Sequence, residues 1–131
     1  MEKKEIKIGD SASVSKTLTE TEVYNFAQIC GDFNPIHINE HEAEKSRFGK
    51  RICHGMLVSS FISTVLGMYL PGPGSIYLEQ TLEFLLPVYI DDTITAKVTV
   101  KEINNKIIVL ETVVINQKGE VVVKGNARIM I

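Results

Sequence analysis

The sequence predicts a single α+β domain in which an antiparallel sheet covers one long buried helix. Apolar side chains occupy most faces of residues 55–70, which is typical of a helix that is buried nearly all round. The second half of the chain then alternates apolar and polar residues, and short polar turns separate the alternating runs. The chain has 131 residues, 44% of them hydrophobic, which suits one domain spanning residues 1–131.

The first elements are a strand and a helix. Residues 11–18 have the character of a short strand. Thr19 and Glu22 then form a capping-box pattern, and Gly31 is a natural C-terminal stop. The sequence therefore predicts a helix over residues 20–30.

Two further helices follow before the sheet. Asn39 and Glu42 have the spacing of a second cap, which predicts a short helix that ends near Ser46. The long buried helix comes next, over residues 55–70.

The rest of the chain consists of strand candidates. Residues 75–90 form one long candidate, in which Pro87 marks a bulge or a sheet edge. Shorter candidates follow, and they predict an antiparallel meander in a sheet of four or five strands: residues 92–103, 107–115 and 121–131. An uncovered sheet edge invites pairing with a second copy, so we expect a homodimer or a higher homo-oligomer.

Composition argues against several classes of protein. The net charge of −2 gives no electrostatic footprint for nucleic acid. Cys30 and Cys53 lack the spacing of redox or zinc motifs, and the first residues do not resemble a secretory signal, so we expect reduced thiols in a cytoplasmic protein. Residues 52–78 contain no charged side chain, but serines, glycines and "PGPG" interrupt them, so we expect no membrane partner.

The stretch "GDFNPIHINE" is the first candidate for chemistry. Asn34 and Pro35 make a helix unfavourable there, and a loop can direct Asp32 and His37 into one space. A carboxylate and an imidazole can together hold a water, one taking a proton and the other giving one, while Asn34 holds backbone or substrate. The spacing alone favours the simpler interpretation, an Asx-Pro turn with a surface histidine.

The start of the buried helix is the second candidate. Gly55 lies where a helix presents free N–H groups, and its lack of a side chain allows a carbonyl oxygen to approach. That arrangement fits an oxyanion hole for a thioester enolate. The position alone favours the simpler interpretation, a glycine that only lets the chain turn into the helix. Ser63 and its neighbouring serines either bond helix carbonyls or contact substrate. The absence of a G-x-S-x-G motif argues against a serine hydrolase.

The sequence also contains residues of the types used in two other kinds of site. The metal-binding candidates lack the spacing of zinc ligands, so we expect no metal, and we expect His41 to be exposed: Asp32, His37, His41 and His54. A basic cluster precedes the buried helix and suits either a solvated face, which is favoured, or the docking of a nucleotide phosphate: Lys45, Arg47, Lys50 and Arg51.

Residues 26–43, "FAQICGDFNPIHINEHEA", resemble the signature of the hydratase 2 group, the (R)-specific enoyl-CoA hydratases of the MaoC-like family. "HGML" and "LPGPGSIYLEQTLEFLLPVYIDD" are similar to that family in the same order. The likeness covers nearly the whole chain and is greatest to short single-domain bacterial members that feed polyester synthesis. It implies a hot-dog fold, in which an antiparallel sheet wraps a long helix and dimerises edge to edge.

The resemblance also implies an activity, the reversible hydration of trans-2-enoyl-CoA to (R)-3-hydroxyacyl-CoA. The catalytic pair of the family falls on Asp32 and His37, and the oxyanion donor falls on the N–H of Gly55. Asn34 matches a supporting asparagine, and Ser63 matches a serine at the acyl end. No cofactor is implied, since coenzyme A is part of the acyl-CoA substrate.

Some questions stay open at this level. Leu66 lies where helix side chains could bound an acyl tunnel, and we expect short acyl chains. Which of Asp32 and His37 takes the proton from water is not decided. The rival functions are a hot-dog thioesterase, an acyl-carrier-protein dehydratase and a non-catalytic acyl-CoA-binding module.

Overall fold

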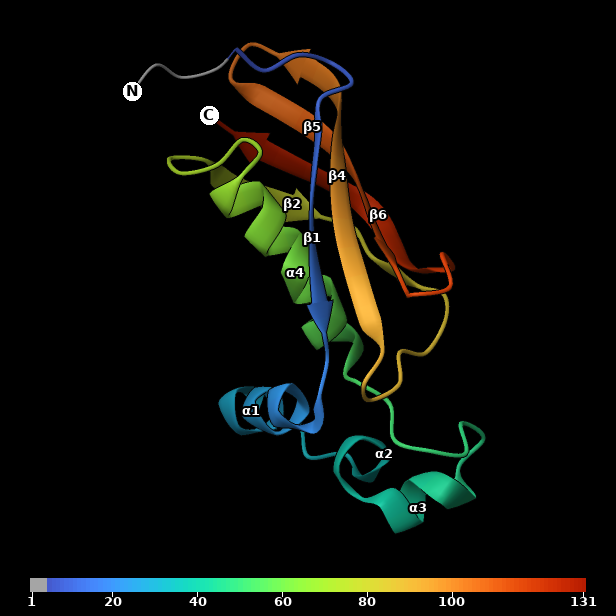
Figure 1. Cartoon of the computed structure of the whole chain (residues 1–131). Coiled ribbons are helices and arrows are strands. Elements are labelled where there is room, and N and C mark those ends of the chain that lie inside the picture. Colours follow the sequence, from blue (N-terminus) through green and yellow to red (C-terminus); the bar gives the residue numbers. More distant parts are fainter. Residues whose placement is uncertain (1–4) are drawn as a thin grey trace.

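The computed structural model describes residues 5–131 and consists of a six-stranded antiparallel sheet with a long helix against one face (Figure 1). The strand order is β1-β4-β5-β6-β2, and β3 pairs with β6. In chain order the elements are β1 (Ser11–Thr17), α1 (Glu20–Cys30), α2 (Pro35–Ile38), α3 (Glu40–Lys45), α4 (Gly55–Met68), β2 (Ile76–Gln80), β3 (Glu83–Phe84), β4 (Thr93–Asn104), β5 (Ile107–Ile115) and β6 (Val121–Met130). This arrangement confirms the predicted α+β class and the hot-dog architecture.

The core lies between α4 and the sheet. Ile62 and Val65 of α4 are fully buried, as are Ile94 and Val98 of β4. On β4 the buried residues alternate with more exposed ones, which is the pattern of a sheet with one covered face. Burial of each such side chain stabilises the fold by about 1.5–3 kcal/mol relative to its exposure.

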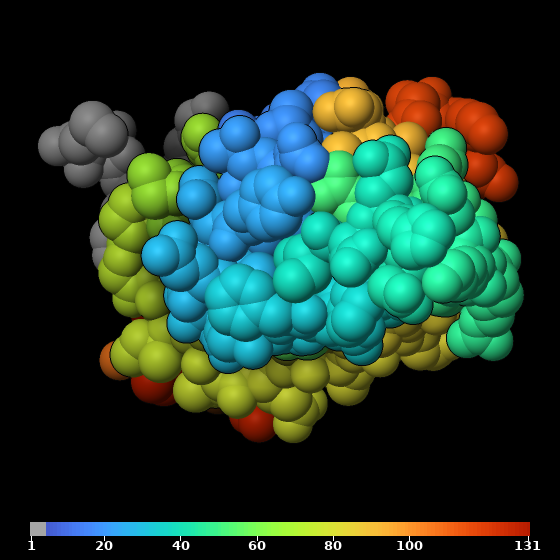
Figure 2. Space-filling model, turned by 90° about the horizontal axis from the view of Figure 1, so that it is seen from below, coloured from blue at the N-terminus to red at the C-terminus, as the bar shows by residue number. Residues whose placement is uncertain are grey.

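The three short helices form a layer at one end of the molecule. Figure 1 places α1, α2 and α3 below the sheet and α4, and Figure 2 shows their residues covering the end seen from below. The predicted stops and caps hold this layer in place. Gly31 adopts a left-handed conformation with φ of 80°, and the Asn39 side chain accepts a hydrogen bond from the N–H of Glu42 at 3.0 Å.

The prediction of one long strand over residues 75–90, in a sheet of four or five strands, is wrong. The segment divides into β2 and β3, which both pair with β6. The register shifts between Tyr77 and Glu79. The chain then lies so close to β6 that a Cβ on Gly125 would be 1.7 Å from the Thr81 carbonyl oxygen. Pro87, which has no N–H to donate, follows the end of β3 at Phe84.

The expectation that Asn34-Pro35 excludes a helix needs a smaller correction. A four-residue helix, α2, begins at Pro35 and carries His37. Proline is acceptable at the first position of a helix, because its missing N–H would have no intrahelical partner there. Asp32 precedes the helix, so the two side chains are not on one continuous helix.

Within residues 5–131, none of the helices is long and apolar enough to cross a membrane.

Candidate active site

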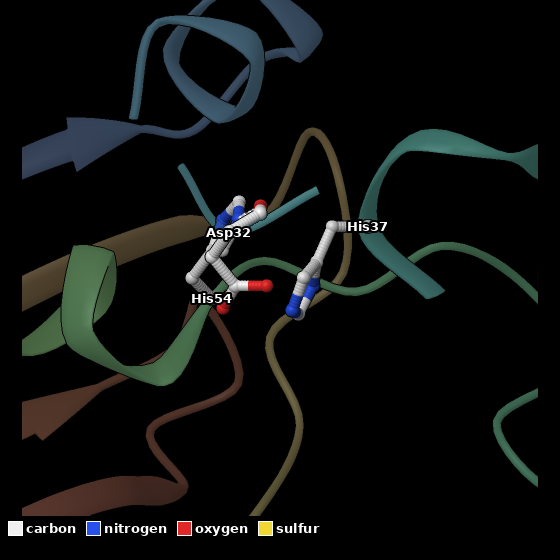
Figure 3. Close-up of side chains that lie close together, drawn as sticks. All are labelled: Asp32, His37 and His54. Atoms are coloured by element: carbon white, nitrogen blue, oxygen red, sulfur yellow. Dashed lines mark hydrogen bonds between the residues drawn. The ribbon is translucent and has the colours of Figure 1, made fainter. Parts of the chain in front are cut away.

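Three side chains from separate segments meet beside the N-terminus of α4. Asp32 comes from the loop after α1, His37 from α2, and His54 from the residue before α4. Each offers an oxygen or nitrogen atom, and these atoms all lie within 4.8 Å of one another. In Figure 3 the Asp32 carboxylate and the His37 ring point toward each other. The sequence predicted a meeting of Asp32 with His37 and gave no role to His54 beyond the rejected metal site.

His37 is held in a defined orientation. The Asn34 side chain accepts a hydrogen bond from the N–H of Ile36 at 3.3 Å, which caps α2. The His37 ring is buried, and its Nδ1 lies 2.8 Å from the carbonyl oxygen of Ile52. A carbonyl only accepts, so Nδ1 must carry the proton, and in the neutral ring Nε2 keeps a free lone pair.

The charge state of His37 follows from its surroundings. Burial lowers the pKa of His37 below its usual value of 6.5 and outweighs the opposing effects of the Ile52 carbonyl and the Asp32 charge. The nearby His54 ring lowers this pKa further. His37 is therefore neutral at pH 7 and can accept a proton at Nε2.

Asp32 lies at the open side of the cluster. Its side chain is exposed, and its carboxylate accepts a hydrogen bond from the N–H of Asn34 at 3.2 Å. The carbonyl oxygen of Asp32 accepts a second bond, from Nε2 of His54 at 2.9 Å. A water beside the cluster would therefore contact both the Asp32 carboxylate and the neutral His37 imidazole.

Gly55 is the first residue of α4, as predicted. The first bond of the helix runs from the N–H of Val58 to the carbonyl of His54 at 3.1 Å, so the N–H of Gly55 has no acceptor within the helix. A Cβ at Gly55 would lie 2.7 Å from the Phe84 ring, so only glycine fits without displacing that ring.

Gly55 also forms part of the wall of a pocket of about 570 Å³. Most of the lining is apolar, and Arg47 is its one charged residue; the lining comprises Arg47, Phe48, Ile52, Cys53, Gly55, Met56, Val58, Phe84, Leu85, Leu86, Pro87, Val88 and Val123. Asp32 and His37 are not part of this lining. His37 reaches its wall through the bond to Ile52.

The other predicted site residues lie farther along α4. Ser63 is exposed. Leu66 is 1% exposed and packs in the central core, outside the lining of the pocket. Of the basic cluster, Arg51 forms an ion pair with Glu20, and Lys50 lies over the Tyr89 ring at 4.4 Å. His41 is exposed, as expected.

The cluster of Asp32, His37 and His54 is the group that could hold a metal among the described residues. Its geometry is poor for that purpose. The two histidine rings are stacked, with centroids 3.9 Å apart and planes at 27°, so their in-plane lone pairs do not converge on one point. One nitrogen of each ring also faces a backbone carbonyl. The expectation of no metal stays a prediction.

Comparison with known proteins agrees with this geometry. Residues 3–123 match the family described as MaoC like domain. The chain is 46% identical to an (R)-specific enoyl-CoA hydratase of Rhodospirillum rubrum over 129 residues, covering 97% of this chain and 89% of that protein. A hydratase of the same name from Aeromonas caviae is 40% identical, over 97% and 96% of the two chains.

Solved structures give the same result. The (R)-hydratase from A. caviae involved in PHA biosynthesis superposes with a TM-score of 0.94 at 40% identity, over 96% of this chain and 97% of that chain. The R-hydratase PhaJ1 from Pseudomonas aeruginosa gives a TM-score of 0.92 at 39% identity, over 95% of this chain and 81% of that one. The chain belongs to the MaoC-like domain family.

Proposed function

We propose that this protein is an (R)-specific enoyl-CoA hydratase, a hydro-lyase that adds water to trans-2-enoyl-CoA and removes it in the reverse direction. The observation that carries the proposal is the meeting of the Asp32 carboxylate with the neutral His37 imidazole beside the helix that starts at Gly55. Relatives that cover nearly the whole chain are hydratases of this specificity.

Substrate binding uses the start of α4. The thioester oxygen accepts a hydrogen bond from the N–H of Gly55, which lies at the positive end of the helix dipole. This bond draws electron density from the conjugated C=C bond and makes C3 electrophilic. The apolar pocket beside Gly55 takes part of the acyl-CoA.

The chemical step uses the pair. A water held between Asp32 and His37 gives a proton to Nε2 of His37 as its oxygen bonds to C3. The electron pair of the C=C bond moves into the enolate, whose oxygen is stabilised by Gly55. The proton on the pair then passes to C2, which regenerates neutral His37 and completes the addition of one water.

The remaining assignments are proposals of the same kind. Asn34 supports the pair by capping α2. Ser63 and Leu66 on α4 bound the acyl end, and short chains are favoured. No cofactor takes part.

The oligomeric state and location are proposed from the surface and the sequence. β2 is an edge strand of the sheet and exposes Ile76, Tyr77 and Leu78. Such an apolar edge suits pairing with a second copy, so we infer a homodimer. The free thiols of Cys30 and Cys53 support a location in the cytoplasm, where thiols are kept reduced.

The experiment is a hydration assay with crotonyl-CoA. The purified protein is expected to bleach the absorbance of the conjugated thioester, and chiral analysis of the product is expected to give the (R)-3-hydroxy isomer. Asp32→Asn should lose most of the rate and stay folded, whereas Glu44→Gln, on the exposed side of α3, should not change it. Release of free CoA without hydration would favour a thioesterase, and binding without turnover would favour a non-catalytic module.

A further inference from the structure

His54 lies next to Asp32, His37 and Gly55, although the mechanism gives it no step. It immediately precedes Gly55 in the chain and is 2% exposed. Its ring lies on that of His37, and its Nε2 lies 2.9 Å from the Asp32 carbonyl oxygen. His54 is therefore buried between Gly55, His37 and Asp32, where it can affect the position of each.

The hydrogen bond to Asp32 anchors an exposed loop. The bond from the N–H of Asn34 to the Asp32 carboxylate spans two residues and is local. The bond from His54 spans 22 residues and ties the Asp32 main chain to the start of α4. The carbonyl can only accept, so His54 must donate from Nε2. This bond holds the Asp32 main chain beside the residue that precedes Gly55.

The stacked ring restrains His37 in a second direction. The His37 and His54 centroids are 3.9 Å apart with planes at 27°, and Phe26 packs against His54 at 4.9 Å with planes at 56°. His37 is also bonded at Nδ1 to Ile52. The bond fixes one edge of the His37 ring and the stack fixes its face, so Nε2 is directed toward Asp32.

We propose that His54 is a positioning residue for the hydration, which holds the Asp32 main chain and the His37 ring at a fixed distance from the oxyanion donor. This inference deepens the proposed function and rests on it. His54 donates to Asp32 at Nε2, and its Nδ1 is buried without a hydrogen-bond partner.

His54 also contributes to the electrostatics of the pair. The titratable groups that act on His37 are His54 and Asp32: His54 lowers the pKa of His37, and Asp32 raises it. Replacement of His54 by a neutral side chain should therefore raise the pKa of His37. A residue that only fills space would not produce this shift when it is replaced by a ring of similar size.

The experiment compares two substitutions that each remove one property. His54→Phe keeps a ring for stacking but removes the donor to Asp32. His54→Gln places an amide N–H near the position of Nε2 and removes the ring. His41→Phe is the matched control, because His41 is exposed on α3 and lies outside the cluster.

In crotonyl-CoA hydration, His54→Phe is expected to lower kcat by about 10- to 100-fold with KM changed less, because a misplacement of about 1 Å has effects of that size. His54→Gln should recover part of the loss. In both variants the acidic limb of the kcat/KM profile, which reports the free enzyme, should move to higher pH. NMR titration of the His37 ring in the free protein should show the same shift without an activity measurement. His41→Phe should leave all of these unchanged.

Several outcomes would overturn the inference. If the wild type is active and both variants keep wild-type kcat and pH profile, His54 does not position the pair. If both lose activity in proportion to a loss of folded protein, measured by thermal unfolding, with no shift of the His37 titration, its role is structural only. Absence of wild-type hydration would instead refute the proposed function, and the positioning role would fail with it.

Discussion

Two substitutions of His37 test the roles of its two ring nitrogens separately. The amide of His37→Asn can occupy the place of Nδ1 and donate to the Ile52 carbonyl, as the ring does at 2.8 Å. It leaves nothing at Nε2. The amide of His37→Gln reaches the place of Nε2 but leaves the Ile52 carbonyl without its donor. Neither amide can take a proton near neutral pH, so both variants lack the proposed base.

The structure predicts different sizes of effect on activity and on stability. Loss of a positioned acid–base group lowers the rate by about 10²- to 10⁴-fold. That range corresponds to about 2.7–5.4 kcal/mol of activation free energy. An unpaired buried carbonyl costs about 1–3 kcal/mol, so His37→Gln should be less stable than His37→Asn by about that amount.

The assays are crotonyl-CoA hydration for the rate and urea unfolding for stability. Both variants should lose activity alike, while their midpoints of unfolding differ. If His37→Asn retains more than a tenth of the wild-type rate, the base is elsewhere. Equal stability of the two variants would show that the bond to Ile52 contributes little.

Three further predictions follow from the same geometry. Burial lowers the pKa of His37 below 6.5, so the acidic limb of the kcat/KM profile should lie below pH 6.5, and a limb at or above pH 6.5 would contradict the lowered pKa. The stability that neutral His37 contributes should be complete above pH 6.5 and should be lost as the pH falls below it. Gly55→Ala should displace the Phe84 ring and lower hydration at least tenfold, Phe84→Ala should restore part of it, and an unaffected rate would show that the N–H of Gly55 is not used. Leu66→Ala should cost about 2–5 kcal/mol of unfolding free energy, because Leu66 packs in the core, and an unchanged free energy of unfolding would contradict that packing role.

The fold was largely predictable because its signals are local and agree with one another. The capping pattern at Thr19 and the glycine at Gly31 mark the ends of α1. The period-two pattern of β4 and β5 corresponds to their buried faces. The break between β2 and β3 lies where Thr81 approaches Gly125, a contact between residues distant in sequence, and no local pattern predicts it.

The site was predictable in part for the same reason. Asp32 and His37 are close in sequence, and the proline between them restricts the backbone, so their approach could be inferred. His54 is an isolated histidine before an apolar helix, and its partners Phe26 and Asp32 precede it by more than twenty residues. The available signal was its place directly before Gly55, which as the N-cap position fixes its backbone beside the end of the helix.

The short segment at Ile52 and Cys53 is neither helix nor regular strand, yet its backbone is bonded on both sides. The N–H of Ile52 bonds to the carbonyl of Ile36 at 3.0 Å, and that of Cys53 bonds to the carbonyl of Val88 at 2.7 Å. Both residues are buried. Amide hydrogens in such a setting exchange with solvent only when the surrounding structure opens. In its exchange behaviour this connecting segment therefore resembles the interior of a sheet, and opening it would separate α2 from the segment that contributes Val88.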